Sequence, residues 1–302
     1  MSDSIKWDLC FYHSADLDGI CSGAIVKKAF PDIELHGYDY GDKFPMAKVA
    51  GKNVIMVDVS LPSTEMVVLG SMAENFLWID HHDTALKAAD EFNWRTVMDV
   101  YGRVANPDGK KVAACELAWE RLIGGPLPTI VHHLSRHDVW DHSDPMTWPI
   151  QYAAQAHCKG PDDGTFWNAL LDDDVPGQDD LILMLVNLGH GIQKYLDQTN
   201  TRVAGQHAFT VELDGYKFIV LNTPHRGSQN LGKFDAQDNR DGEFDGGAVY
   251  CQLPDGRWRH SLYAFNDDIH VGEIAKRRGG GGHKGAAGFI TKTPAFSPVP
   301  KL

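Results

Sequence analysis

Two acidic residues and two histidines occupy four consecutive positions of the sequence, namely Asp80, His81, His82 and Asp83. The apolar residues 76–79 directly before them predict a short buried strand. Polar side chains at the tip of a buried strand cost free energy unless they bind something. Carboxylate oxygens and imidazole nitrogens together suit a divalent ion such as Mn, Mg, Fe or Zn. A polar surface loop with two histidines is the alternative interpretation of this stretch taken alone.

Further candidate ligands follow two earlier predicted strands, over residues 9–12 and 53–59. These candidates are His13, Asp16, Asp18 and Asp58. In an open parallel α/β sheet, functional sites gather at the carboxyl ends of the strands. We therefore expect side chains that are far apart in the sequence to build one site at that edge.

Asp18 has a second interpretation, because a helix is expected over residues 20–30 and Asp is a common helix N-cap. A cap explains one acidic residue, whereas residues 13–18 contain three potential ligands. A later helix, expected over residues 127–139, ends in Arg136, His137 and Asp138. One acid here would complete a pair of metal positions, and we favour Asp138 over Asp141.

Composition and charge restrict the class of protein. The 302 residues are enough for two domains, and the apolar content is ordinary for a globular protein. The five cysteines are scattered, and neither a membrane-length apolar run nor a secretion signal is recognised, so we expect a cytoplasmic protein with reduced thiols. The net charge of −13 disfavours proteins that grip long nucleic acids, so a phosphate-ester substrate should be short.

The second half of the chain predicts a separate α+β domain. An acidic Pro-Gly loop over residues 172–177 precedes apolar residues at helical spacing from 181 to 195. Two hairpins are expected from residues 209–221 and 248–265, the first around an Asp-Gly turn. We expect an α/β protein of two lobes, a parallel-sheet domain and a smaller mixed-sheet domain joined by a helical linker. The expected boundaries are 1–177, 178–205 and 206–295, followed by a tail over 296–302.

The most basic stretch, residues 276–285, contains four consecutive glycines. Glycines expose backbone N–H groups and allow a ligand to approach closely. A phosphate or base clamp and a flexible loop with cations at a helix end are both open interpretations. A second polar loop, residues 222–230, is either another phosphate-binding loop or an ordinary turn. The candidate substrate-binding residues are Arg226, Ser228, Arg278, Gly281, Gly282 and His283.

Five motifs in this order make the chain similar to the DHH phosphoesterases, a family that includes RecJ-type exonucleases, nanoRNases and cyclic-dinucleotide phosphodiesterases. The first four are HSADLDG, VDVS, DHH and RHD, at residues 13–19, 57–60, 80–82 and 136–138. The fifth, GGGGHKGAAGF at residues 279–289, resembles the glycine-rich signature of the DHH-associated domain. Together the motifs cover most of the chain.

The resemblance implies a site with two divalent metal ions, usually manganese, with magnesium, cobalt or iron as alternatives. It implies that Asp58 bridges the ions, that Asp80 orients a ligand or imidazole, and that His82 faces the substrate or leaving group. One departure from the family is that two residues separate His13 from Asp16, where three are common. The implied ligands are His13, Asp16 and Asp58 for one ion, and Asp18, Asp58, His81 and Asp138 for the other.

The resemblance also implies a metal-dependent phosphodiesterase that hydrolyses very short RNA, such as the linear dinucleotide pGpG, to nucleoside 5′-monophosphates. A cyclic dinucleotide, a 3′-phosphoadenosine nucleotide and single-stranded DNA stay open as alternative substrates. A nucleotide-binding regulator without turnover is the non-enzyme alternative, and a homodimer is possible. The expected partner is therefore a short oligonucleotide or dinucleotide rather than a membrane.

Overall fold

The computed structural model describes residues 5–40, 42–172, 177–234 and 242–296. The chain divides into two compact units, residues 1–193 and 194–302, and each has its own sheet. The predicted acidic loop and the predicted tail fall largely outside the described residues, which do not include 173–176 and 297–302. No helix in the described part of the chain is long and apolar enough to cross a membrane.

The first unit is built on a five-stranded parallel sheet in the order β2-β1-β3-β4-β5. Chain order reverses between β1 and β3, and ligand sites in open α/β sheets form at such a switch point. His13 ends β1, while Asp58 follows β3 and Asp80 ends β4. The strands are β1 (Leu9–His13), β2 (Glu34–Tyr38), β3 (Asn53–Val57), β4 (Asn75–Asp80) and β5 (Asp99–Gly102).

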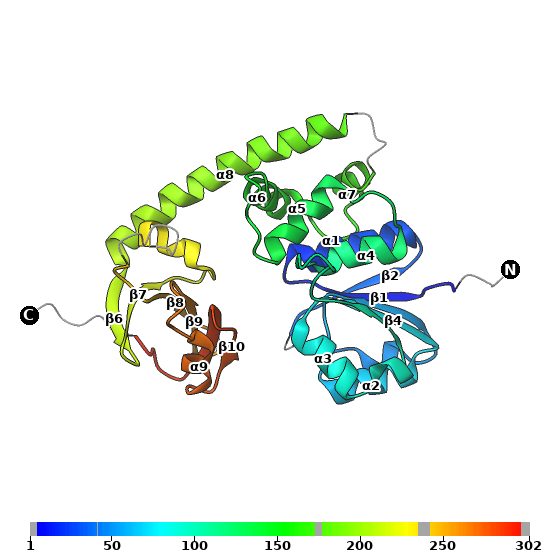
Figure 1. The fold of residues 1–302 in the computed structure, drawn as a ribbon, viewed down its shortest axis with the longest axis horizontal. Coiled ribbons are helices and arrows are strands. Elements are labelled where there is room, and N and C mark those ends of the chain that lie inside the picture. The colour runs from blue at the N-terminus through cyan, green and yellow to red at the C-terminus, as the bar shows by residue number, and fades with distance from the viewer. Residues whose placement is uncertain (1–4, 41, 173–176, 235–241, 297–302) are drawn as a thin grey trace, which may run out of the picture. The chain divides into compact units, whose positions relative to one another are not determined.

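Helices cover both faces of this sheet, with α1 and α4 on one side and α2 and α3 on the other (Figure 1). Each face has its own apolar core, and the central strands β3 and β4 are buried almost throughout. Such continuous burial is typical of parallel strands between two helical layers. The helices are α1 (Leu17–Ala29), α2 (Ser63–Met72), α3 (Asp83–Glu91), α4 (Ala114–Leu122), α5 (Thr129–Asp138), α6 (Thr147–His157) and α7 (Gly164–Leu170), with short 3-10 turns at Met46–Lys48 and Trp94–Thr96.

The second unit has a six-stranded sheet in the order β10-β11-β9-β8-β7-β6, in which only β7 and β8 pair in parallel. Asp214 and Gly215 form the tight turn of the first hairpin, and both have positive φ angles, as the Asp-Gly pair predicts. The elements are β6 (Phe209–Leu213), β7 (Tyr216–Asn222), a 3-10 segment (Ser228–Phe234), β8 (Gly246–Gln252), β9 (Trp258–Ala264), α9 (Val271–Lys276), β10 (Gly281–Gly282) and β11 (Ala286–Thr291).

The long helix α8 (Gln178–His207) occupies the segment for which a linker helix was expected. The predicted fold class, a parallel-sheet domain followed by a mixed-sheet domain, is confirmed. Two local expectations were wrong at their boundaries. The helix expected from residue 20 begins at Leu17, and the strand expected over 53–59 ends at Val57, so Asp58 lies in the turn after it.

Candidate metal centre

Asp58 lies in a strained turn at the carboxyl end of β3. Its φ angle is +59°, in the left-handed region that residues with a Cβ rarely adopt. Its amide N–H donates to the carbonyl of Ile79 on the neighbouring strand at 3.0 Å, which helps to fix the turn. Strained backbone of this kind clusters at functional sites, because the surrounding structure must hold it in place. The turn directs a fully buried carboxylate toward the switch point of the sheet.

The two oxygens of Asp58 face two different groups of candidate ligands. Oδ2 lies 3.4 Å from Nδ1 of His13, and the same nitrogen lies 2.8 Å from a carboxylate oxygen of Asp16. Oδ1 lies 3.5 Å from Nε2 of His81, which in turn approaches Asp138 at 3.3 Å and Asp18 at 3.8 Å. Asp58 therefore stands between two clusters of nitrogen and oxygen donors, in the arrangement that a bridging ligand requires.

The hydrogen bonding of these atoms fits a metal centre. Among the described residues, both carboxylate oxygens of Asp58, Nδ1 of His13 and Nε2 of His81 are buried and make no hydrogen bond of regular geometry, although Nδ1 of His13 approaches Asp16 at 2.8 Å. Buried polar atoms are nearly always satisfied, so four such atoms in one place indicate a missing binding partner. Groups of ligand atoms within 4.8 Å of one another include His13, Asp16 and Asp58, and also Asp18, His81 and Asp138. Their donor set suits divalent ions that accept oxygen and imidazole nitrogen.

Asp18 is held by the start of another helix. Its carboxylate accepts hydrogen bonds from the backbone N–H groups of Ala114 and Cys115, at 2.9 and 2.8 Å. These are the first residues of α4, whose N–H groups have no partner within the helix and whose dipole favours an anion. The N-cap of α1 is Asp16, which accepts from the N–H of Gly19, so the capping interpretation of Asp18 is wrong.

Asp80 is fully buried and organises the two histidines that follow it. Its Oδ1 atom accepts from the backbone N–H groups of His81 and His82, at 2.6 and 2.9 Å. The same oxygen lies 2.7 Å from Nδ1 of His82 and fixes that imidazole. Carboxylates that do not bind the metal themselves but orient its ligands by hydrogen bonds are common around metal sites. This geometry agrees with the orienting role that was expected for Asp80, while the role itself stays a prediction.

Proton affinities in the cluster reflect the crowding of charge. Burial and the neighbouring Asp18 raise the pKa of Asp138 to about 7, and the pKa of Asp58 is raised well above its ordinary value for the same two reasons. Burial acts to lower the pKa of His13 and of His81, but the adjacent carboxylates raise these values to about 11 and about 10. The cluster therefore attracts positive charge, which protons or metal ions can provide.

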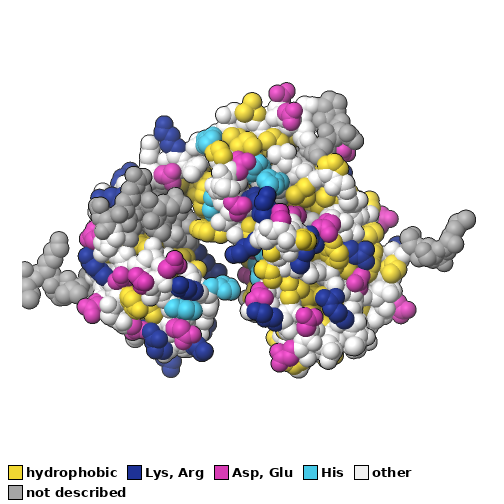
Figure 2. Space-filling model, viewed as in Figure 1, with side chains coloured by type: hydrophobic (Ala, Val, Ile, Leu, Met, Phe, Trp, Pro, Cys, Tyr) yellow, Lys and Arg dark blue, Asp and Glu magenta, His cyan; other side chains and the backbone are white. Residues whose placement is uncertain are grey.

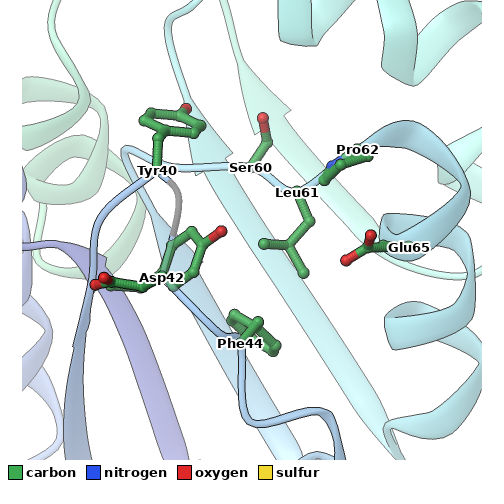
Figure 3. Close-up of a pocket in the computed structure, with 8 residues that line it drawn as sticks. Tyr40, Asp42, Phe44, Ser60, Leu61, Pro62 and Glu65 are labelled. Carbon is green, nitrogen blue, oxygen red and sulfur yellow. The ribbon is translucent and has the colours of Figure 1, made fainter. Parts of the chain in front are cut away.

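A pocket adjoins the centre on the side of the loop after β2 and the turn after β3. It has a volume of about 440 Å³ and is lined by Tyr38, Tyr40, Asp42, Phe44, Ser60, Leu61, Pro62 and Glu65 (Figure 3). A second pocket of about 320 Å³ shares Tyr40 and the turn residues 60–62 and is also lined by His82. The imidazole of His82 is 41% exposed, so this side chain borders a hollow that is open to a ligand.

The glycine-rich motif lines a separate pocket in the second unit. This pocket has a volume of about 880 Å³, and Arg226, Gly281 and Gly282 are among its lining residues. Apart from Gly281 itself and its two chain neighbours, no non-hydrogen atom of the described residues lies within 4 Å of a Cβ built on Gly281, so this position faces open space. A Cβ on Gly280 would instead lie 2.1 Å from the carbonyl oxygen of Gly288, so that glycine is required by packing.

Three of the predicted substrate-binding residues do not line this pocket. Arg278 is paired with Asp214, which accepts hydrogen bonds from it at 2.6 and 2.9 Å. Ser228 begins the 3-10 segment, and His283 is exposed and donates its backbone N–H to Ala286. Their roles in substrate binding stay predictions.

Sequence reasoning missed two cations that line the same pocket, Arg259 on β9 and Arg257 directly before that strand. Arg259, Ser261 and Tyr263 alternate along β9 and line the pocket, as residues on one face do. The signal in the sequence was the spacing of the two arginines, which lie two positions apart in a predicted hairpin. Tyr250 and Trp258 pack in the core of the second unit.

The chain resembles known proteins at low sequence identity but over nearly its whole length. No family model matches the chain. An uncharacterized protein of Acanthamoeba polyphaga mimivirus is 22% identical over 319 residues, covering 97% of this chain and 68% of that protein. A solved structure described as the DHH domain of a ribosomal-protein family member has a TM-score of 0.50 and 14% identity, with 95% of this chain and 83% of that chain covered. A pGpG-specific phosphodiesterase, PggH from Vibrio cholerae, has a TM-score of 0.47 and 14% identity, with 95% and 93% covered.

The chain therefore has a DHH-domain fold, and this confirms the fold that the sequence motifs implied. Within that fold, the motif residues from β1, β3, β4 and α5 meet at the switch point of the parallel sheet. The cluster can hold divalent metal, as its buried and unsatisfied ligand atoms indicate.

We predict that Asp58→Asn lowers the number of divalent ions bound per chain, because an amide offers one oxygen where the carboxylate offers two. The same change should raise the unfolding temperature of the metal-free protein, because it removes a buried charge close to Asp18. Metal analysis after dialysis against Mn and a thermal melt in chelator would measure both effects.

Asp83→Asn is the matched control, because Asp83 is exposed and paired with Lys87 on the first turn of α3. It should leave metal content unchanged. Full metal content in Asp58→Asn would contradict the bridging assignment.

Proposed function

We propose that the chain is a metal-dependent phosphodiesterase that hydrolyses very short RNA, including linear dinucleotides such as pGpG, to nucleoside 5′-monophosphates. In this reaction water adds to phosphorus, the bond from phosphorus to the 3′ oxygen breaks, and that oxygen leaves with a proton. The DHH-domain fold alone does not define an activity. The chemistry of the side chains clustered around Asp58 supports this one.

One observation carries the proposal, namely the buried carboxylate of Asp58 with an unsatisfied oxygen toward each ligand group. A single metal position does not require a carboxylate that faces two sets of donors. His13 and Asp16 would hold one ion with Asp58, and Asp18, His81 and Asp138 would hold the other with Asp58. The mixed oxygen and imidazole donors favour manganese, and magnesium, cobalt or iron are compatible with the same atoms.

When bound, a pair of divalent ions neutralises phosphate charge and lowers the pKa of a water molecule that attacks phosphorus. The protein contributes the positions of its own side chains. Asp18 is fixed by the N-terminus of α4, and the turn at Asp58 is fixed by its bond to β4. Side chains anchored on rigid elements keep their geometry during a reaction, which lowers the cost of reaching the transition state.

His82 is the residue of the cluster that we assign to the leaving group. Asp80 engages its Nδ1 atom at 2.7 Å, so Nε2 is the ring nitrogen available to a substrate oxygen. The imidazole is 41% exposed and lines the pocket that it shares with Tyr40 and Ser60. From that position Nε2 can donate a proton or a hydrogen bond to the departing 3′ oxygen.

The preference for short substrates follows from charge. On the face shown in Figure 2, Lys and Arg side chains are interspersed with Asp and Glu rather than gathered in one broad region. The net charge of −13 opposes the approach of a long polyanion. Local cations in the second unit, Arg226 and Arg259 beside the glycine loop, supply a binding site for a few phosphates at most.

We predict that the protein with Mn cleaves labelled RNA of two to about seven nucleotides, with the highest kcat/KM for the shortest, because charge repulsion grows with chain length. Product analysis by chromatography should show nucleoside 5′-monophosphates. The same assay should include cyclic dinucleotides, a 3′-phosphoadenosine nucleotide and single-stranded DNA. Cleavage of one of these in preference to every RNA would replace the substrate class, and no cleavage of any phosphoester would refute the activity.

A second prediction concerns the pocket of the second unit. Arg226→Gln should raise KM for a dinucleotide about ten- to a hundredfold, because a charge-assisted hydrogen bond to phosphate contributes about 1.5–3 kcal/mol. Metal content should stay at the wild-type value. Arg95→Gln is the control, because Arg95 is an exposed arginine that approaches Asp90 in the first unit. A normal KM in Arg226→Gln would show that the pocket does not bind the substrate phosphate.

A further inference from the structure

The chain leaves α5 through a turn in which Trp140 occupies a position that usually belongs to glycine. The φ angle of Trp140 is +61°, in the left-handed region. Its N–H donates to the carbonyl of His137 at 3.1 Å, and the N–H of Asp141 donates to the carbonyl of Arg136 at 2.8 Å. These are the paired bonds of a Schellman motif, whose left-handed residue is most often Gly because Gly has no Cβ.

Polar contacts keep this turn in place. The carboxylate of Asp141 approaches Arg136 at 3.7 Å and accepts from the hydroxyl of Ser143 at 2.7 Å. In many Schellman motifs these two positions make an apolar contact instead. The turn is therefore fixed by its neighbours, although Trp140 itself is unfavourable there. Strained conformations that the surroundings enforce are typical of functional positions.

The side chain of Trp140 packs at the edge of an aromatic wall, the cluster of rings formed by His142, Trp148 and Tyr152, and most of it is exposed to solvent. The residue is 66% exposed, a high value for the largest of the apolar side chains. Its ring makes edge-to-face contacts with His142 and Trp148, at centroid distances of 4.7 and 5.9 Å. Trp148 is itself stacked between His142 and Tyr152. The wall restricts the indole of Trp140 but leaves most of it uncovered.

This aromatic wall lies beside the metal centre. Trp140 follows the candidate ligand Asp138 by two residues, through the turn just described. His137 contacts both Trp140 and Trp148, at centroid distances of 6.2 and 4.7 Å, and it is close enough to Asp16 for that carboxylate to act on its charge. The exposed indole thus lies two residues from Asp138, a proposed ligand of one ion. It also contacts His137, which is near Asp16, a proposed ligand of the other ion.

We infer that Trp140 stacks on a nucleobase of the substrate whose phosphate occupies the metal centre. The inference rests on the proposed function for the class of substrate. A base is attached to the phosphate that the metal ligands attract, and its π face matches an exposed indole. Stacking also adds affinity without positive charge, which suits a chain of net charge −13. The backbone of the turn gives no reason for Trp here, because glycine is the better residue for a left-handed conformation.

The test compares Trp140→Leu, Trp140→Gly and Trp140→Phe in the full chain with Mn. Leu keeps apolar bulk without a ring, Gly fits the backbone, and Phe keeps a ring. KM for a dinucleotide should rise about ten- to a hundredfold in Leu and Gly, the range expected from losing one base–aromatic stack. KM should stay near the wild-type value in Phe. The unfolding temperature of Trp140→Gly should equal or exceed that of the wild type.

Two further measurements separate this inference from the proposed function. Of the two dinucleotides that carry one abasic residue, the one that lacks the stacked base should be cleaved by the wild type and by Trp140→Leu with equal KM. Phe92→Ala, which removes another exposed aromatic of the same unit, should leave KM unchanged for both substrates. If the wild type cleaves dinucleotides and Trp140→Leu has a normal KM for the intact one, the stacking inference is overturned and the function stands. No cleavage by the wild type would refute the function.

GMP binding provides a readout that does not depend on turnover. Titration of GMP into the Mn-loaded protein should quench tryptophan fluorescence in the wild type and much less in Trp140→Phe. Equal quenching in the two proteins would place the base elsewhere and overturn the inference.

Discussion

The structure of the first unit depends on the burial of carboxylates close to one another at the switch point of the sheet. Asp18 and Asp58 are almost fully buried, and Asp138 lies in the same ligand cluster. Like charges at such short range oppose folding unless cations or protons offset them. The chain concentrates supporting interactions here, including the helix N-terminus behind Asp18 and the left-handed turn at Asp58. Stability and metal binding are therefore coupled in this unit, because ions that bind only the folded chain stabilise it.

Much of this arrangement could be predicted from the sequence, because it follows from local patterns. Short apolar runs that end in acids predict parallel strands with ligands at their carboxyl ends, and such ends meet at one edge of a sheet. Local patterns alone therefore predict that His13, Asp58 and Asp80 lie at that edge. The Asp-Gly turn at Asp214 likewise follows from residue type, since both of its positions need positive φ angles.

Other features depend on contacts that no local pattern encodes. Asp18 is held by the amides of residues 114 and 115, almost a hundred positions later, so its anchoring needed the three-dimensional fold. The sequence predicts that Arg278 binds phosphate, but in the structure its guanidinium forms an ion pair with Asp214 of the same unit. The left-handed conformation of Trp140 contradicts its residue type, because tertiary contacts overrule the intrinsic preference. Sequence rules fail most informatively at such positions, where a strained residue marks a candidate for function.

The central claim is that Asp58 bridges two metal ions, and anomalous diffraction from crystals saturated with Mn tests it most directly. The account predicts two manganese peaks, one within bonding distance of each carboxylate oxygen of Asp58. His13 and Asp16 should contact one of them, and Asp18, His81 and Asp138 the other. A single peak, or peaks that leave both oxygens of Asp58 without a metal neighbour, would contradict the account.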